Sequence, residues 1–201
     1  MIGVVDYGMS NLGSVMNALA HLRADARLIA RGDDLSGVDR LLVPGQGAFG
    51  DCMEGLRSRG FAQPLLDWIA ADKPFLGICM GLQLLFDASE EAPGVKGLGV
   101  FPGTITRFQS AELKIPQMGW NRVEWTAPNP LFEGIPSGSH FYFVHSFYAP
   151  RTGAAHEAGL TGYGQTYVSA VSRGRVHAVQ FHPEKSQALG LKLLGNFAGR
   201  G

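Results

Sequence analysis

The sequence predicts an α/β fold with a mixed, mostly parallel sheet flanked by helices. In the first half, short apolar runs alternate with segments of helical periodicity, and this order implies right-handed crossovers and parallel strand pairing. In the second half, strand-like segments follow one another with little helix between them. These segments are expected to extend the sheet with antiparallel strands. We therefore expect residues 1–201 to form a single domain.

The first half supplies the parallel part of the sheet. The apolar stripe that begins at Leu12 recurs at spacings of three and four, which is typical of a helix. Pro44 and Gly45 are a turn signal, so the strand before them is expected to stop there. Strands are expected at residues 2–5, 26–30, 39–43 and 75–78, and helices at residues 11–22, 61–71 and 80–86.

The second half supplies the antiparallel strands. Ser172, Arg173 and Gly174 separate two apolar runs and predict a hairpin turn. Strands are expected at residues 100–108, 122–125, 141–148, 167–171 and 175–181, and a last helix at residues 188–197.

The composition limits the classes of function. The chain has 17 Lys and Arg against 17 Asp and Glu, so its formal net charge is zero. A neutral chain lacks the basic surface that nucleic-acid binding or a polybasic membrane contact requires. No apolar run approaches the roughly 18 residues of a membrane span, and the first residues do not resemble a signal peptide. We expect a cytoplasmic protein with no nucleic-acid or membrane partner.

No cofactor and no metal ion are expected. Gly3 and Gly8 lie near the first strand, but they do not form the dinucleotide-binding pattern, and no acidic residue follows at the right distance. The two cysteines match no metal-binding spacing. His140 and His145 lie in an aromatic segment without a second ligand cluster, so we interpret them as part of a half-buried strand.

Cys79 is the candidate nucleophile. It lies in the segment Gly77-Ile78-Cys79-Met80-Gly81, where an apolar strand gives way to a helical pattern. This is the spacing of a nucleophile elbow, in which small neighbours relieve the crowding of a sharp strand-to-helix turn. A helix N-terminus also favours a thiolate. The alternative is an ordinary buried cysteine, which is our interpretation of Cys52, because its flanks lack this pattern.

His182 is the candidate base and Glu184 its orienting partner. His182 follows an apolar strand, and the spacing of two to Glu184 places both side chains on one side of an extended segment. Pro183 between them keeps the backbone extended. Glu184 would hold one imidazole nitrogen while the other faces Cys79. Taken alone, the three residues are more typical of a surface turn, and it is the elbow cysteine that favours the functional interpretation.

A third segment could supply an oxyanion hole. Residues 43–47 (VPGQG) follow an apolar strand, and Gly45 and Gly47 leave backbone N–H groups unshielded. The N–H of Met80, directly after the nucleophile, would be the second donor. A simple turn is the alternative for the glycines.

Together these segments resemble the class I (triad) glutamine amidotransferases, through residues 77–83 (GICMGLQ), 44–50 (PGQGAFG) and 181–186 (FHPEKS). Within that family the chain is similar to the glutaminase subunits of imidazole glycerol phosphate synthases, through residues 6–12 (DYGMSNL), 116–121 (PQMGWN) and 142–147 (YFVHSF). The resemblance extends along the whole chain and implies a flavodoxin-like glutaminase fold with added antiparallel strands. No fused synthase domain is expected.

The resemblance implies a role for each triad residue. Cys79 would attack the side-chain amide of glutamine and form a glutamyl thioester. His182 would take the thiol proton and deliver one to the leaving ammonia, and Glu184 would orient His182.

The resemblance also implies how glutamine is held. Gln83 is similar to the family residue that contacts the glutamine. The N–H of Gly47 and the main chain near Ser146 and Phe147 would bind its carboxylate and amine.

A partner is implied as well. Ammonia would pass to a (β/α)8-barrel cyclase subunit on a separate chain, in a heterodimer. That subunit makes imidazole glycerol phosphate and an aminoimidazole carboxamide ribotide by-product in histidine biosynthesis. The residues similar to family positions near this interface are Asn11, Gln117, Trp120, Tyr142 and Lys185.

The chain departs from the family pattern at three positions. The family commonly has glycine where Ser10 stands and a basic residue where Gly13 stands. Gln46 replaces a small aliphatic residue in the expected oxyanion loop.

Two other functions remain open at this stage. The chain could be the glutaminase subunit of another synthase, such as pyridoxal phosphate synthase, although residues 6–12 and 116–121 are not expected there. It could also be a catalytically silent binding subunit, although the complete set of Cys79, His182 and Glu184 argues against this.

Overall fold

The computed structural model describes residues 1–9 and 12–199. Within those residues a 12-stranded sheet has the main strand order β2-β1-β3-β4-β12-β11-β10-β7-β8. The first five of these strands run parallel to their neighbours, and pairing is antiparallel from β12 onward. The prediction of a mixed α/β sheet is confirmed.

The parallel strands are short and apolar. They are β1 (Ile2–Val5), β2 (Ala26–Ile29), β3 (Arg40–Gly45), β4 (Phe75–Cys79) and β12 (Val176–Val179). All residues of β1 and β4 are buried, as expected for strands that have helices on both faces of the sheet.

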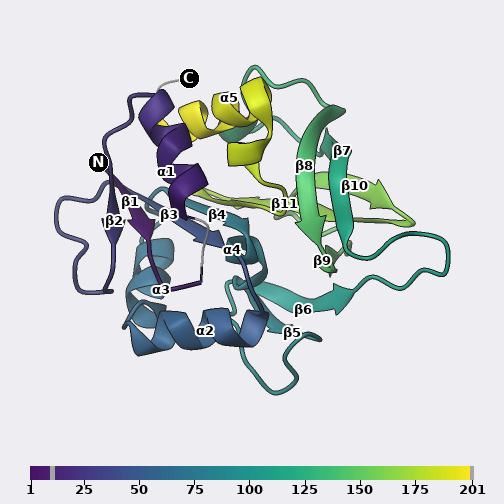
Figure 1. Ribbon diagram of the computed structural model, residues 1–201, viewed down its shortest axis with the longest axis horizontal. Helices are drawn as coiled ribbons and strands as arrows, with labels where there is room; N and C mark the ends of the chain where they lie inside the picture. The colour runs from purple at the N-terminus through teal and green to yellow at the C-terminus, as the bar shows by residue number, and fades with distance from the viewer. Residues whose placement is uncertain (10–11, 200–201) are drawn as a thin grey trace.

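Helices cover both faces of this parallel part (Figure 1). The helices α1 (Leu12–His21) and α5 (Gln187–Ala198) lie on one face, and α2 (Phe49–Ser58) and α3 (Ala62–Ala70) lie on the other. Each face has its own buried cluster. Leu19 and Leu193 belong to the first, and Leu56 and Leu65 to the second. Burial of one leucine side chain contributes about 1.5–3 kcal/mol, so the two clusters hold the layers together.

The antiparallel part forms the other end of the molecule. Its strands are β6 (Phe101–Arg107), β7 (Gln117–Trp125), β8 (Ser139–His145), β9 (Phe147–Pro150), β10 (Glu157–Tyr163) and β11 (Gln165–Arg173). The strand β5 (Phe86–Ser89) pairs with β6, and β6 pairs with β9. Two short 3-10 helices, η1 (Pro130–Phe132) and η2 (Pro183–Lys185), complete the connections.

The boundaries of several helices and strands differ from those expected. The expected helix at residues 80–86 ends early, as α4 (Met80–Gln83), and β5 begins at Phe86. All seven residues from 80 to 86 are buried, so no polar face marked the end of the helix. The expected strand at residues 141–148 is two strands, β8 and β9, because the chain changes partner at Ser146: β8 pairs with β7, and β9 with β6 and β11.

Pro44 does not end the third strand. The strand β3 continues to Gly45, and Pro44 and Gly45 pair with Ile78 and Cys79 of β4. On the other side, pairing of β3 with β1 ends at Leu42. Proline has no backbone N–H to donate. Because β1 does not pair with Pro44, no hydrogen bond to β1 is lost there.

Like β5 and the two 3-10 helices, the helix α2 and the strand β10 were not expected. Gly50 and Gly55 lower the helix propensity of the α2 segment. A side chain at Gly55 would place its Cβ 2.5 Å from the carbonyl oxygen of Tyr7, so close packing requires the glycine. The β10 segment likewise contains glycines, Gly159 and Gly162, which are uncommon in strands.

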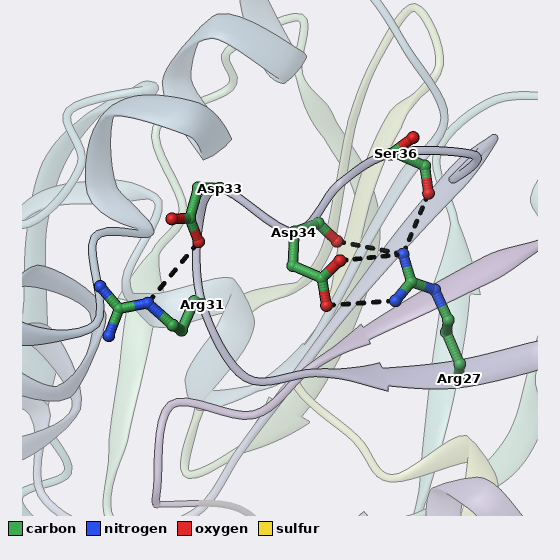
Figure 2. Close-up of polar contacts among 5 residues, drawn as sticks. All are labelled: Arg27, Arg31, Asp33, Asp34 and Ser36. Atoms are coloured by element: carbon green, nitrogen blue, oxygen red, sulfur yellow. Dashed lines mark hydrogen bonds and ion pairs between the residues drawn. The ribbon is translucent and has the colours of Figure 1, made fainter.

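The loop after β2 is closed by a single arginine. Arg27 donates to the carboxylate of Asp34 at 3.1 Å and to the carbonyl oxygen of Ser36 at 3.0 Å, as Figure 2 shows. The ion pair between Arg31 and Asp33, at 3.6 Å, is largely exposed, and such pairs contribute little. Arg27 therefore organises this loop.

Across residues 1–9 and 12–199, no helix has the length and apolar character to cross a membrane.

Candidate active site

The strand β4 ends at Cys79 in a strained backbone conformation. Cys79 has φ +54° and ψ −105°, outside the regions that a side chain normally allows. The helix α4 begins at the next residue. Strain of this kind persists only where the surroundings enforce it, and it is typical of functional sites.

The neighbouring glycines allow this turn. A Cβ at Gly81 would lie 2.0 Å from the carbonyl oxygen of Val43, and a Cβ at Gly77 would lie 2.5 Å from the carbonyl oxygen of Gly81. The backbones of β3, β4 and α4 are therefore in direct contact. Only glycine fits at either position, which is the crowding that the elbow pattern predicts.

His182 and Glu184 reach the same edge of the sheet from β12. The strand β12 is parallel to β4, with Val179 opposite Ile78, so the segment after it continues beside Cys79. Glu184 Oε1 lies 2.8 Å from His182 Nδ1, and both side chains are 2% exposed. His182 Nε2 is buried and has no hydrogen-bond partner among the described residues. This nitrogen is the one available for a thiol proton.

The backbone around His182 is held by Ser186 and β8. The His182 N–H donates to the carbonyl oxygen of Tyr142 at 2.9 Å. The hydroxyl of Ser186 donates to the His182 carbonyl oxygen at 2.6 Å and accepts from the Tyr142 N–H at 3.0 Å. The imidazole is therefore fixed by its backbone as well as by Glu184.

The electrostatics favour a charged imidazole. Burial alone lowers the pKa of His182, but its interactions with Cys79 and Glu184 outweigh it and raise this pKa to about 10. A basic imidazole beside a cysteine is the arrangement that activates a cysteine nucleophile.

A cavity of about 340 Å³ opens beside the sulfur. Its lining brings together most of the expected substrate-binding residues, namely Gly47, Met80, Gln83, Ser146 and Phe147, with Cys79 and His182. Gln46, Glu91, Pro116, Val144 and His145 complete it. A larger groove, of about 710 Å³, lies between Trp125 and Ile135. It contains no triad residue, so the smaller cavity is the candidate site.

Gly45 and Gly47 occupy different environments. Gly45 is buried in β3 and is not part of the cavity lining in the described chain. A Cβ there would lie 2.4 Å from the Tyr7 hydroxyl and 2.5 Å from the Met80 Cβ, so its small size serves packing. Gly47 is exposed at the cavity and has φ +110°. Of the two, Gly47 is the one that lines the cavity.

Cys52 orients the loop that carries Gly47. Its thiol donates to the carbonyl oxygen of Gln46 at 3.5 Å, and the Gln46 N–H donates to the carbonyl oxygen of Met9 at 3.0 Å. Burial raises the pKa of Cys52 to about 11, so the thiol keeps its proton. Because the C=O and N–H of one trans peptide point in opposite directions, the Gly47 N–H points away from Cys52.

A family model gives the comparison that decides the class of protein. The model described as glutamine amidotransferase class-I matches residues 3–198. This chain belongs to the class I glutamine amidotransferase family. All three residues of the amidotransferase's candidate triad, Cys79, His182 and Glu184, lie within the matched region.

Relatives of this amidotransferase share its full length. It is 45% identical to the imidazole glycerol phosphate synthase subunit HisH of Syntrophotalea carbinolica, with 98% of each chain covered. It is 47% identical to the protein of the same name from Deinococcus radiodurans, with 96% of this chain and 91% of that one covered.

Solved structures support the fold. A glutamine amidotransferase crystal structure superposes with a TM-score of 0.75 at 22% identity and covers 98% of both chains. The PurLQS structure from Thermotoga maritima gives a TM-score of 0.77 at 17% identity, with 98% of this chain and 97% of that one covered.

The expected interface residues of the amidotransferase are not all exposed. Trp120 is 47% exposed, and its ring meets that of half-buried Tyr142 edge-on at 6.2 Å between centroids. Gln117 is 3% exposed, and its oxygen accepts from the Tyr167 hydroxyl at 2.9 Å. Gln117 therefore faces the interior, because its position in β7 alternates with exposed Met118. Lys185 is half-buried, and Asn11 lies outside the described residues.

One site residue was missed. Gln180 is fully buried, and its Nε2 donates to Cys79 Sγ at 3.6 Å. The signal was present, because Gln180 is a polar residue in the apolar run from Val176 to Phe181.

Among the described residues, no group of three or more His, Cys, Asp or Glu side chains is placed to hold a metal ion.

Proposed function

We propose that this chain is the glutaminase subunit of an imidazole glycerol phosphate synthase, with Cys79, His182 and Glu184 as its catalytic triad. The observation that carries the proposal is that the elbow cysteine and His182 line one cavity, with His182 hydrogen-bonded to Glu184 at 2.8 Å. The HisH relatives, at 45–47% identity over nearly the whole chain, support the choice of synthase.

The proposed chemistry begins with an ion pair. The Cys79 thiolate attacks the amide carbon of glutamine, a C–S bond forms, and the carbonyl electron pair moves to oxygen. The intermediate collapses to a glutamyl thioester as His182 Nε2 delivers its proton to the leaving ammonia. The neutral imidazole then takes a proton from water, whose oxygen attacks the thioester and releases glutamate. Glu184 keeps the imidazole oriented throughout.

Backbone donors would stabilise the oxyanion. Gly47 and Met80, whose N–H groups would be the donors, both line the cavity that contains the sulfur. Fixed donors of this kind are often the largest contribution to catalysis of acyl transfer. Gln83 and the main chain near Ser146 and Phe147 would hold the glutamine.

Ammonia would pass to a separate (β/α)8-barrel cyclase subunit in a cytoplasmic heterodimer. The cyclase would use it to make imidazole glycerol phosphate and the aminoimidazole carboxamide ribotide by-product of histidine biosynthesis. Exposed Met118 and Trp120 on β7 support a docking face there, since they are 66% and 47% exposed. Large apolar side chains grouped on a surface are typical of protein–protein contacts.

A glutaminase assay tests the proposal. Glutamate release should be measured for the chain alone, with the cyclase, and with the cyclase and its phosphorylated ligand. We expect hydrolysis to rise strongly in the last condition. A catalytically silent subunit would give no hydrolysis in any of them.

Removal of the nucleophile separates the two half-reactions. Cys79→Ala should abolish synthesis from glutamine, because no thioester forms, and should spare synthesis from added ammonia. The measurement is imidazole glycerol phosphate production from each nitrogen source. Loss of both activities together would contradict transfer of ammonia between subunits.

Complementation distinguishes the synthases. The chain, expressed with the cyclase, should restore growth of a histidine auxotroph that lacks its glutaminase subunit. Restored growth of a pyridoxal phosphate auxotroph instead would assign the chain to that other synthase.

A further inference from the structure

A pair of buried side-chain amides connects the catalytic sulfur to the backbone of β9. Gln180 Nε2 donates to Cys79 Sγ at 3.6 Å, and Gln180 Oε1 accepts from Gln83 Nε2 at 3.0 Å. Gln83 Nε2 also donates to the carbonyl oxygen of Phe147 at 3.1 Å. Gln83 is 2% exposed and Gln180 is fully buried. Neither amide can therefore exchange these partners for bulk water.

The direction of both amides is determined by one backbone group. The carbonyl oxygen of Phe147 only accepts hydrogen bonds, so Gln83 must turn its nitrogen toward it. That nitrogen also faces Gln180, so Gln180 must turn its oxygen toward Gln83. The nitrogen of Gln180 is then left for the sulfur of Cys79, which accepts.

The Phe147 carbonyl is itself fixed. His145 Nδ1 lies 2.7 Å from this oxygen, and burial lowers the pKa of His145 to about 4. The ring is therefore neutral at physiological pH and places its single N–H on Nδ1, toward the carbonyl. The carbonyl oxygen of Phe147 is therefore a fixed acceptor, and it determines which way the amides of Gln83 and Gln180 are turned.

The register of the sheet brings Gln180 to the sulfur. Val179 of β12 pairs with Ile78 of β4. Gln180 directly follows β12, and Cys79 is the last residue of β4. The Gln180 N–H donates to the Ser169 carbonyl oxygen at 2.8 Å, which fixes the backbone from the β11 side. The side chain is therefore held beside Cys79 by both neighbouring strands.

We propose that Gln180 is a positioning residue for Cys79, whose amide N–H holds the sulfur and stabilises it as a thiolate. The inference rests on the proposed function, because it gives Gln180 a part in the same site. A hydrogen bond to an ionised acceptor is stronger than one to a neutral acceptor, so the donor favours the thiolate over the thiol. The pair also leaves Gln83 Oε1 buried and without a partner in residues 1–9 and 12–199, available for a substrate N–H.

Alkylation of Cys79 tests the proposal without requiring turnover. The full chain is treated with iodoacetamide, and the modified residue is identified by peptide mapping, so that Cys52 is scored separately. Gln180→Met keeps the length of the side chain and removes the donor. We expect the rate at neutral pH to fall about ten- to hundredfold, the effect of losing a hydrogen bond to a charged group. Gln180→Glu places a carboxyl group against the sulfur and should lower the rate further.

Ser169→Ala is the matched control. Ser169 lies on β11 opposite Gln180, is fully buried, and accepts from the Thr161 hydroxyl at 2.7 Å. The variant removes a buried hydrogen bond from the same region but leaves the donor to the sulfur in place. It should alkylate at the wild-type rate, and the melting temperatures of all variants show whether each one folds.

The pH profile separates positioning from packing. The other titratable groups around the sulfur are His182 directly before η2, Cys52 from α2, and Tyr7 and Tyr167, and all remain in the variants. We expect the alkylation profile of Gln180→Met to move to higher pH and, in the complex, kcat for glutamine to fall more than KM changes. A folded Gln180→Met that alkylates at the wild-type rate and pH would overturn the proposal. If Gln180→Met loses alkylation but the wild-type chain never hydrolyses glutamine, the positioning role of Gln180 would be supported and the glutaminase function rejected.

Discussion

Burial acts differently on the titratable residues of this chain. His182 lies beside Cys79 and Glu184, and their interactions with it raise its pKa to about 10 despite burial. His145 and His177 have no comparable partner, and burial lowers the pKa of each to about 4. Cys52 has its pKa raised by burial to about 11 and stays a hydrogen-bond donor. The partner that each residue meets, more than its type, decides its charge at neutral pH.

His177 should make the protein sensitive to acid. Its pKa falls from 6.5 in the unfolded chain to about 4 in the folded protein, so below pH 6.5 only the unfolded state takes up the proton. Stability is therefore fully present above the unfolded value and declines as the pH falls toward the folded one. This residue should account for about 1–2 kcal/mol of the loss between about pH 7 and about pH 5.

Urea unfolding of His177→Gln at those two pH values measures this effect. The variant should lose less free energy of unfolding on acidification than the wild-type chain does. His145 is retained in both proteins, so its own contribution cancels. An identical pH dependence of the two proteins would show that His177 is protonated equally in both states.

At the scale of elements, the contact of β3, β4 and α4 determines where the nucleophile lies. The strand β3 pairs with β4 up to Gly45 and Cys79, and α4 then folds back onto β3 at Gly81. The four residues of α4 are too few to form a stable helix alone. This helix depends on the tertiary contact, and the strained Cys79 depends on the helix.

Gly81→Ala should therefore be severely destabilising. The new Cβ would lie 2.0 Å from the Val43 carbonyl oxygen, and the backbone of one element would have to move. We expect a loss of about 3 kcal/mol or more in the free energy of unfolding, measured by thermal or urea unfolding.

Gly13→Ala is the control for that substitution. Gly13 is exposed in α1, and a Cβ there meets nothing within 4 Å. Alanine is favoured over glycine in helices, and Gly13 lies in the first turn of α1, so this variant should gain at most about 0.5–1 kcal/mol. If both variants changed stability alike, close packing at the elbow would not be the reason for Gly81.

At the scale of the whole molecule, the sheet has two ends with different surfaces. The strand β2 lies at the end of the parallel part and β8 at the end of the antiparallel part. Large exposed apolar side chains occur at both ends in the described chain, Leu28 on β2 and Met118 and Trp120 on β7. Trp120 and Tyr142 pair across β7 and β8, so the apolar surface is more extensive at the antiparallel end.

Trp120→Ala should weaken binding of the proposed cyclase. A tryptophan at the centre of an interface commonly dominates the affinity, so we expect Kd to rise about tenfold or more. Leu28→Ala removes a side chain of similar exposure, 44% against 47%, from the opposite end of the sheet and should leave Kd unchanged. Titration calorimetry with the purified cyclase measures both. Equal effects would place the interface elsewhere.

The sequence by itself determined the α/β class, the elbow at Cys79 and the pairing of His182 with Glu184. These features rest on local rules: apolar periodicity, glycine spacing at a sharp turn, and a separation of two residues on an extended segment. The family resemblance rests on the same segments.

Only the tertiary structure decided the early end of α4, the passage of β3 through Pro44, and the burial of Gln117. Each of these features depends on which strand lies alongside. A segment that is buried on every side has no alternation of polar and apolar residues that would indicate its neighbour. Gln180 is the clearest case. Its residue type was visible in an apolar run, but its hydrogen bond to Cys79 exists because β12 and β4, about 100 residues apart in sequence, pair in parallel register.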